Sequence, residues 1–215
     1  MALPEAVRNK IFLMEEVINF PTSLLSHQDY HWKNVPMVPY SDLQGAVSSL
    51  VEKGKKAAIV TGFYVPGGEP PATETDGPPG ALILAEGLRH MGMEVLLISD
   101  PYSYSALSAG LHILGLTEDE IPALSIPMEH PEEDSGSSLS LQFVKEFFEG
   151  PLGRGLTHLV YIERVGPNHT LESFLSQYPA DPALLKEFEA ILPPPMRNRC
   201  FNSRLRDITP FTGKT

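Results

Sequence analysis

The sequence has little cysteine and no long apolar run. Cys200 is the only cysteine in 215 residues, so an intrachain disulfide is impossible and we favour a thiol in a reducing compartment. Nowhere do apolar residues continue for the about 20 positions that a membrane-spanning helix needs. The start of the chain also lacks the apolar core of a secretory signal. We therefore expect a soluble protein with no membrane partner.

Positive charge is also scarce. The chain has 16 Lys and Arg against 27 Asp and Glu, which gives a net charge of -11. The electric field of a protein with this net negative charge repels phosphate backbones and anionic lipid, so we expect no nucleic-acid partner. Four arginines near the end form a local basic patch, which we interpret as a solvated tail or a tail folded on an acidic face: Arg197, Arg199, Arg204 and Arg206.

Several binding motifs are missing. The dinucleotide motif GxGxxG and the phosphate loop ending in Gly-Lys-Ser/Thr do not occur, so NAD and ATP are unsupported as cofactors. His27 and His31 have the i, i+4 spacing of helical metal ligands, but Pro21 and Pro36 bracket them and no third ligand is evident. We predict no histidine metal site.

The first part of the chain is predicted to be helical and then extended. From Pro4 to Asn19, apolar residues recur at helical spacing, which predicts an amphipathic helix. The stretch from Phe20 to Tyr40 is rich in proline and aromatic residues, which favours an extended segment.

From Ala57 onward, short apolar runs alternate with helical stretches, which is the pattern of βαβ units. The predicted strands are Ala57–Phe63, Glu94–Ser99, Ala123–Pro127 and Thr157–Glu163, and the predicted helices are Pro79–Met91, Tyr104–Leu114 and Leu139–Phe148. The runs do not alternate apolar with polar residues, as expected of strands covered on both faces. We therefore predict an α/β fold, a Rossmann-like three-layer sandwich with a mainly parallel sheet. It forms one domain, 1–215, with a helical and extended segment at 1–56, a βαβ core at 57–192 and an irregular Pro/Arg-rich tail at 193–215.

A long loop after the first predicted strand is the first candidate binding element. It closes with Glu74-Thr75-Asp76-Gly77-Pro78-Pro79-Gly80-Ala81, just before a helix. Glycines allow backbone to approach a ligand closely, and free amides at a helix start attract an anion. The alternative is a stiff connection in which Thr75 or Asp76 caps the helix. The loop is longer than a usual βα link, which favours function. We expect residues 64–77 to be accessible and mobile without ligand.

Acidic residues follow two further predicted strands: Asp100 after the second, and Glu163 with Arg164 after the fourth. The carboxyl ends of parallel strands share one edge, where open α/β sheets bind ligands. Acids gathered there can act as general acid or base, or hold Mg²⁺. The alternatives are a helix cap for Asp100 and an ion pair of Glu163 with Arg164. The candidate catalytic residues are Glu74, Asp76, Asp100 and Glu163, and the candidate substrate- or anion-binding residues are Gly62, Thr75, Gly77, Gly80 and Arg164.

Three stretches together resemble the C-terminal domain family of D-glutamate cyclase. They are Thr61-Gly62-Phe63-Tyr64 through Glu74-Thr75-Asp76-Gly77-Pro78-Pro79-Gly80-Ala81, then Ile98-Ser99-Asp100, then Tyr161-Ile162-Glu163-Arg164-Val165-Gly166. The resemblance implies a lyase that converts D-glutamate to 5-oxo-D-proline with loss of water. It also implies a location in the mitochondrial matrix and a companion cyclase domain in the full-length protein. The cofactor stays open, with Mg²⁺ as one option.

Two features depart from the family pattern. An Asn-Met-Arg-Gly-like stretch reads Asn202-Ser203-Arg204-Leu205 here, and the Gly-Asp-rich loop that should follow Asp207-Ile208 is missing. We therefore expect a shortened form, active alone or only within the full-length protein. The alternative function is a non-catalytic regulatory module that holds a nucleotide or metabolite, because a Rossmann-like fold alone does not choose between the two.

Overall fold

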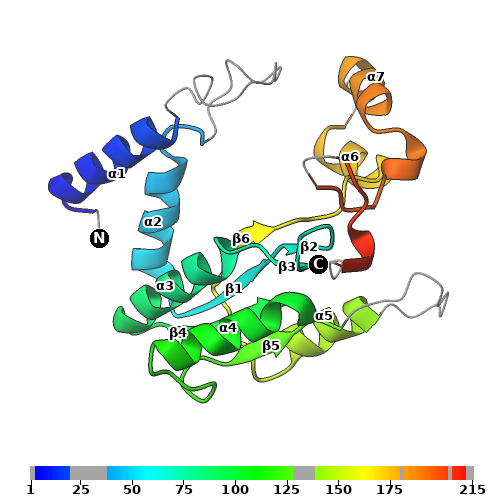
Figure 1. The fold of residues 1–215 in the computed structure, drawn as a ribbon. Helices are drawn as coiled ribbons and strands as arrows, with labels where there is room; N and C mark the ends of the chain where they lie inside the picture. Colours follow the sequence, from blue (N-terminus) through cyan, green and yellow to red (C-terminus); the bar gives the residue numbers. More distant parts are fainter. Residues whose placement is uncertain (1–2, 20–37, 128–138, 180–181, 203–204, 212–215) are drawn as a thin grey trace. The chain divides into compact units, whose positions relative to one another are not determined.

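The computed structural model describes residues 3–19, 38–127, 139–179, 182–202 and 205–211 (Figure 1). The candidate histidines His27 and His31 and most of the predicted extended stretch lie outside these ranges. The chain divides into two compact units, Met1–Gly54 and Lys55–Thr215. The single-domain organisation inferred from the sequence stays a prediction. Among the helices described, none is both long and apolar enough to cross a bilayer.

The first unit is a pair of helices, α1 (Glu5–Ile18) and α2 (Asp42–Lys53). The amphipathic helix expected at Pro4–Asn19 is confirmed as α1. Glu15 of α1 is buried, and its carboxylate accepts hydrogen bonds from the backbone amides of Ser41 at 3.2 Å and Leu43 at 3.0 Å. These amides start α2 and lack helical partners, so Glu15 replaces the missing cap. The sequence analysis did not predict α2.

The second unit is built on a four-stranded parallel sheet in the order β5-β4-β1-β6. Its strands are β1 (Lys56–Gly62), β4 (Glu94–Ser99), β5 (Ala123–Ser125) and β6 (His158–Arg164). All four predicted strands are confirmed: β4 has the predicted bounds, and the ends of the other three differ by one or two residues. The central strands β1 and β4 are buried on both faces, which explains their continuous apolar runs.

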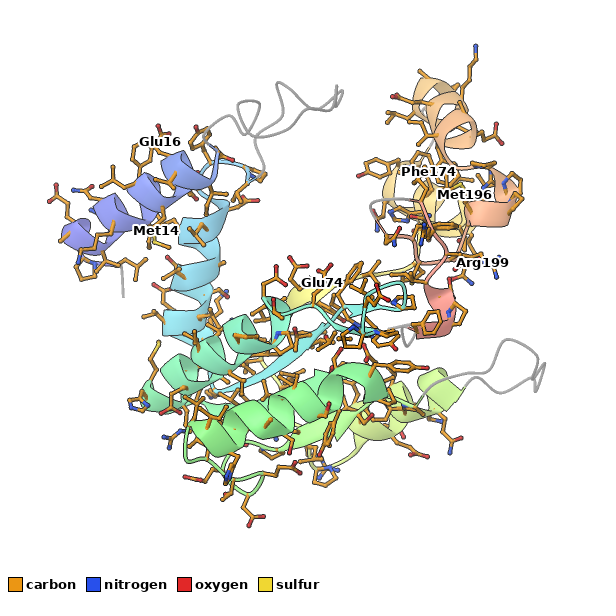
Figure 2. The ribbon with its side chains drawn as sticks, in the orientation of Figure 1. Met14, Glu16, Glu74, Phe174, Met196 and Arg199 are labelled. Atoms are coloured by element: carbon orange, nitrogen blue, oxygen red, sulfur yellow. The ribbon has the colours of Figure 1, made fainter. Side chains whose placement is uncertain are left out.

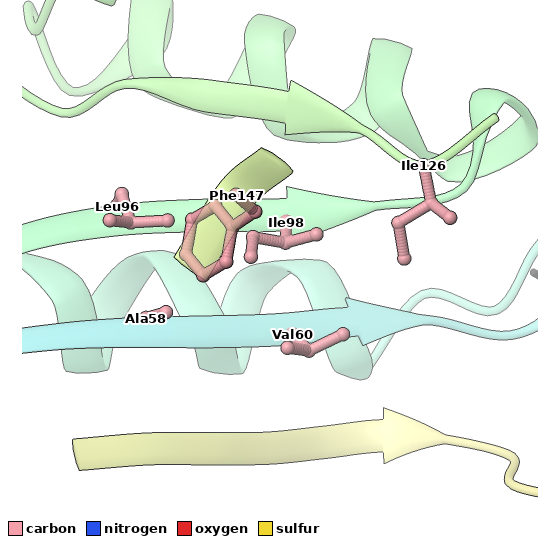
Figure 3. Packing of buried hydrophobic residues seen from close by; sticks show 6 residues of the cluster. All are labelled: Ala58, Val60, Leu96, Ile98, Ile126 and Phe147. Carbon is pink, nitrogen blue, oxygen red and sulfur yellow. The ribbon is translucent and has the colours of Figure 1, made fainter. Parts of the chain in front are cut away.

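Helices cover both faces of this sheet, so the predicted Rossmann-like three-layer sandwich is confirmed. Helices α3 (Gly77–His90) and α4 (Pro101–Ile113) pack side by side on one face (Figure 1). On the other face, Phe147 of α5 (Leu139–Glu149) packs over β1 and β4, as Figure 3 shows. The core cluster there contains Ala58, Val60, Leu96, Ile98, Ile126 and Phe147.

Both α3 and α4 begin earlier than the sequence predicts, for the same reason. Asp76 and Asp100 occupy the cap positions, and each is followed by a proline at the first or second helical position. Proline fits there because its missing N–H would have no helical partner, and its φ is already helical. The prolines therefore belong to the helices and not to the loops before them.

The edge strand β6 differs from its neighbours. Its residues alternate between half-buried and exposed, and Leu159 and Tyr161 are 41% and 51% exposed. By their pairing with Ala58 and Val60, these two residues lie on the α5 face of the sheet. Ile162 lies on the opposite face, next to Gly80 of α3. The alternation of β6 matters for the site, because Glu163 is the last residue but one of this strand.

The long loop after β1 contains a small hairpin, β2 (Tyr64–Val65) and β3 (Ala72–Thr73), that the sequence analysis did not predict. The ring of Tyr64 stacks on Tyr102 of α4, with 4.3 Å between centroids. Phe211, in the last short helix η3 (Thr209–Phe211), lies 5.5 Å from Tyr64. The mobility of the loop stays a prediction.

The remaining elements are α6 (Leu171–Gln177), α7 (Pro182–Ile191) and the short helix η2 (Pro194–Met196). The rings of Phe174 and Phe188 stack with 4.3 Å between their centroids. The guanidinium carbon of Arg197 lies over the Phe188 ring, 5.1 Å from its centroid. Phe174, Met196 and Arg199 are labelled in Figure 2. Neither α6 nor α7 was predicted. In the described residues after 193 the tail is irregular, as expected, apart from the two short helices η2 and η3.

Candidate functional site

The strand order creates one point at which the chain changes direction across the sheet. From β1 the chain moves outward through β4 to β5, and then crosses to β6 on the other side of β1. The loops that leave the carboxyl ends of β1 and β6 therefore diverge. Such a switch point is where open α/β sheets bind ligands.

Three carboxylates meet at this switch point. Glu74 follows β3, Asp76 caps α3 and Glu163 is the last residue but one of β6, and one oxygen atom of each lies within 4.8 Å of the other two. Glu74 is half-buried, whereas Asp76 and Glu163 are exposed (Glu74 is labelled in Figure 2). Partial burial raises the pKa of Glu74, and the nearby charges of Asp76 and Glu163 raise it further.

The backbone at Glu163 brings its side chain into the group. The pairing of β1 with β6 shifts between Thr61 and Gly62, so Glu163 is an extra residue in the ladder, and its φ is 46°. Such a bulge changes the direction of a side chain. Without it, alternation would place Glu163 on the same face as Tyr161. With it, Glu163 Cβ lies 2.8 Å from the point that a Cβ on Gly77 would occupy, at the start of α3.

The left-handed backbone of Glu163 is unusual for a residue with a side chain. Strained positions of this kind cluster at functional sites, where surrounding structure holds them in place. Sequence periodicity cannot reveal a bulge, because the bulge adds one residue to an otherwise regular strand.

Asp100 lies at the same edge but makes different contacts. Its side chain is fully buried, its Oδ1 accepts a hydrogen bond from the Ser103 amide at 2.9 Å, and its Oδ2 accepts one from Arg164 at 2.6 Å. The cap expected as an alternative for Asp100 is confirmed. The alternative pairing of Glu163 with Arg164 is wrong, because Arg164 turns to Asp100. A catalytic role for Asp100 stays a prediction.

Gly62 allows these contacts to form. Its φ is 119°, and a Cβ there would lie 2.7 Å from Ser99 Oγ and 2.8 Å from Ser103 Oγ. Its carbonyl also accepts a hydrogen bond from Arg164 at 3.2 Å. Only glycine fits such a conformation at such close range. Gly62 thus has a structural reason to be glycine, and its role in binding a ligand stays a prediction.

The start of α3 does not offer the free amides that the sequence analysis expected. The Gly77 amide donates to Asp76 Oδ1 at 3.2 Å, and the Gly80 amide donates to the Asp76 carbonyl at 3.1 Å. Pro78 and Pro79, between them, have no N–H to donate. Direct capture of an anion by these amides is therefore unsupported. Thr75 is exposed and Gly80 approaches Ile162, and their roles in binding stay predictions.

Thr61 was missed by the sequence analysis. Its side chain is fully buried, and Oγ1 has no hydrogen-bond partner among the described residues. This hydroxyl lies 2.8 Å from the point that a Cβ on Gly77 would occupy, as does Glu163 Cβ. A buried hydroxyl without a partner costs about 1 to 3 kcal/mol unless water or a ligand satisfies it. A polar residue ending an apolar strand was the available signal.

Comparison with known families places a family model on this chain. The family model described as D-glutamate cyclase-like, C-terminal, matches residues 26–172, more than half of the chain. The matched range includes Glu74, Asp76, Asp100, Glu163 and Arg164. A search among curated proteins finds no match. Since the match includes the whole parallel sheet and its carboxyl edge, the chain belongs to the D-glutamate cyclase-like C-terminal family.

Proposed function

We propose that this chain is a domain of a D-glutamate cyclase, and that D-glutamate binds at the carboxyl ends of β1 and β6. The observation that carries the proposal is the position of Glu74, Asp76 and Glu163 at the switch point of the sheet, inside the range that matches the family. The ligand is thus a small amino acid with two carboxylates, and the reaction is the loss of water that gives 5-oxo-D-proline.

The reaction needs protons to move from nitrogen to oxygen. The substrate ammonium loses two protons, its nitrogen attacks the carbon of the distal carboxylate, and a C–N bond forms. The C–O bond of that carboxylate breaks, and its oxygen leaves with the two protons as water. Acidic side chains close to both groups can carry the protons.

The three clustered carboxylates suit the ammonium end of the substrate. Asp76 and Glu163 are exposed, so a ligand can reach them, and negative charge attracts a cationic amine. Asp100 and Arg164 have a structural role, because they form an ion pair that connects the ends of β4 and β6. We therefore propose the cluster as the group that contacts substrate, and the buried pair as its support.

A nucleotide-binding module is less well supported. Phosphate groups bind best to free backbone amides at a helix start, and those of α3 are used or replaced by proline. We therefore favour the enzyme over the nucleotide-binding module. The mitochondrial matrix and the companion cyclase domain, which the family resemblance implies, belong to the same proposal.

Incubation of the purified chain with D-glutamate, followed by chiral chromatography for 5-oxo-D-proline, tests the proposal. L-glutamate is the substrate control, and the full-length protein is assayed beside the chain. Product from either protein that falls at least about tenfold in Asp76→Asn, but not in Glu94→Gln, supports the site. Glu94 begins β4 at the opposite edge of the sheet. Its variant removes one carboxylate charge, as Asp76→Asn does, but away from the candidate site.

A stability measurement completes the test. D-glutamate should raise the melting temperature of the chain, because a ligand that binds the native state stabilises it. The proposal fails if neither protein forms product and D-glutamate leaves the melting temperature of both unchanged.

A further inference from the structure

The three carboxylates at the switch point place negative charges close together, without a cationic side chain among the described residues to balance them. Within the described residues, none of Glu74, Asp76 and Glu163 forms an ion pair with a lysine or arginine. We propose that Glu74, Asp76 and Glu163, together with the Thr61 hydroxyl, form a binding site for a hard divalent cation such as Mg²⁺, Mn²⁺ or Ca²⁺.

The spacing of the carboxylates fits one cation. Opposite ligands of a cation are separated by twice the metal–oxygen distance, which is about 4.2 Å for Mg²⁺ and about 4.6 to 5.2 Å for Ca²⁺. The oxygen atoms of the cluster all lie within 4.8 Å of one another. A single ion can therefore contact all three carboxylates. For Mg²⁺, the smaller cation, the carboxylate oxygens need to move only slightly closer together.

The chemistry of the donors points the same way. Carboxylate and hydroxyl oxygens are hard ligands, which suit Mg²⁺, Mn²⁺ and Ca²⁺ and not the softer metals that take sulfur or imidazole. No cysteine or histidine belongs to the cluster. Two of the three carboxylates are exposed, so an ion can enter from solvent and keep some of its water.

Thr61 gives an independent indication of a ligand. Its Oγ1 is buried and lacks a hydrogen-bond partner among the described residues. It lies next to Gly77 at the start of α3, 2.8 Å from the point that a Cβ on Gly77 would occupy. Glu163 Cβ lies at the same 2.8 Å from that point, so the hydroxyl and the first side-chain carbon of Glu163 both adjoin the space where Gly77 has no side chain. In the proposed site this hydroxyl is the neutral oxygen ligand that accompanies the three carboxylates.

Electrostatics also favours a cation. Three carboxylates with oxygen atoms within 4.8 Å of one another repel each other unless a positive charge lies between them. A bound dication offsets most of the charge. With the ion bound, the cluster contacts a carboxylate of D-glutamate through the ion and no longer contacts its ammonium directly, a consequence that rests on the proposed function and refines it.

Titration of the purified chain with Mn²⁺, followed by the loss of the free-ion electron paramagnetic resonance signal, tests the site directly. We expect one saturable site per chain, with competition by Mg²⁺ and Ca²⁺. Glu163→Gln should weaken Mn²⁺ binding at least about tenfold, and Thr61→Val, which keeps the shape of the side chain, also about tenfold. Glu94→Gln makes the same charge change at the other edge and should bind Mn²⁺ like the wild type.

Circular dichroism and thermal melting establish that each variant is folded, and Glu74→Gln replaces any variant that is not. Absence of saturable Mn²⁺ binding by the wild-type chain, or equal binding by Glu163→Gln and Glu94→Gln, overturns the proposal. The readout needs no turnover. A chain that binds Mn²⁺ but makes no 5-oxoproline retains the metal site and loses only the proposed reaction.

Discussion

Arg164 and Asp100 form an ion pair that crosses the central strand of the sheet. Arg164 Nη1 lies 2.6 Å from Asp100 Oδ2, and the two side chains are 1% and 0% exposed. Arg164 ends β6 and Asp100 follows β4, with β1 between them. The same Nη1 donates to the Gly62 carbonyl at the end of β1. One guanidinium thus connects three strand ends at the edge of the sheet that carries the candidate site.

Loss of this pair should destabilise the fold strongly. Arg164→Met leaves the Asp100 carboxylate buried without its cation, which typically costs about 3 to 5 kcal/mol. Urea denaturation measures the change in the free energy of unfolding. Arg199→Met is the control, because its pair with Asp207 is 49% and 28% exposed and should contribute less than about 1 kcal/mol. Equal losses in both variants would contradict the role of the buried pair.

Gly77 should tolerate no side chain. A Cβ there would lie 2.8 Å from both Thr61 Oγ1 and Glu163 Cβ, so Gly77→Ala must displace one of them and should cost about 1 to 3 kcal/mol. Gly87, in the same helix, has open space around its missing Cβ. Gly87→Ala should therefore stabilise the chain by about 0.5 to 1 kcal/mol. Thermal unfolding compares the two, and opposite signs are the expected result.

The loop between Tyr64 and Gly77 should exchange its amide hydrogens faster than β1. Its hairpin has only two residue pairs, and much of its surface is exposed. The ring contacts of Tyr64 with Tyr102 and Phe211 attach the hairpin to α4 and to the end of the chain's described part. Phe211→Ala should raise exchange in the hairpin up to about tenfold, since a ring contact contributes about 0.5 to 1.5 kcal/mol.

Ile113→Ala is the matched control for that experiment, because Ile113 lies on α4 with Tyr102 but is 83% exposed. Mass spectrometry after deuterium labelling locates the change. Protection throughout the loop in the ligand-free chain, as strong as that of β1, would show that the loop is not mobile.

The tail should loosen in acid because of Asp207. Burial alone would raise the pKa of this carboxyl, but hydrogen bonds from Thr209 and the nearby Arg199 guanidinium bring it below its ordinary value of 3.8. A lowered pKa in the folded state means that ionised Asp207 stabilises the tail above that value, and that this stabilisation disappears as the pH falls through the lowered pKa.

Amide exchange of residues 200–209, corrected for intrinsic rates, measures this pH dependence. Asp207→Asn should remove the acid-induced loosening, because the amide does not titrate. An identical pH profile in the wild type and the variant would assign the loosening to other groups.

Much of the fold was determined by the sequence alone. Continuous apolar runs such as those of β1 and β4 predict strands covered on both faces, and the helical stretches between them predict parallel crossovers. Parallel strands bring their carboxyl ends to one edge. For that reason Glu74, Asp76, Asp100 and Glu163 could be expected at one edge before any coordinates existed.

The elements that were missed have weak local signals. Helix α2 gains its cap from the buried Glu15 of α1, distant in sequence, and the β2–β3 hairpin has only two residue pairs. Neither feature shows in a periodic pattern. Their stability comes from contacts between segments, which periodicity does not contain.

Only the tertiary structure separated the acids into two groups. Asp100 is buried against Arg164, while Glu74, Asp76 and Glu163 form a separate cluster. The division depends on a one-residue bulge at Glu163 and on the absence of a Cβ at Gly77. The sequence by itself determined which strands form and which edge carries the acids, because those follow from hydrophobic pattern and chain connectivity. Which carboxylates face each other was decided by packing, because a shift of one residue in a strand reverses the direction of its side chains.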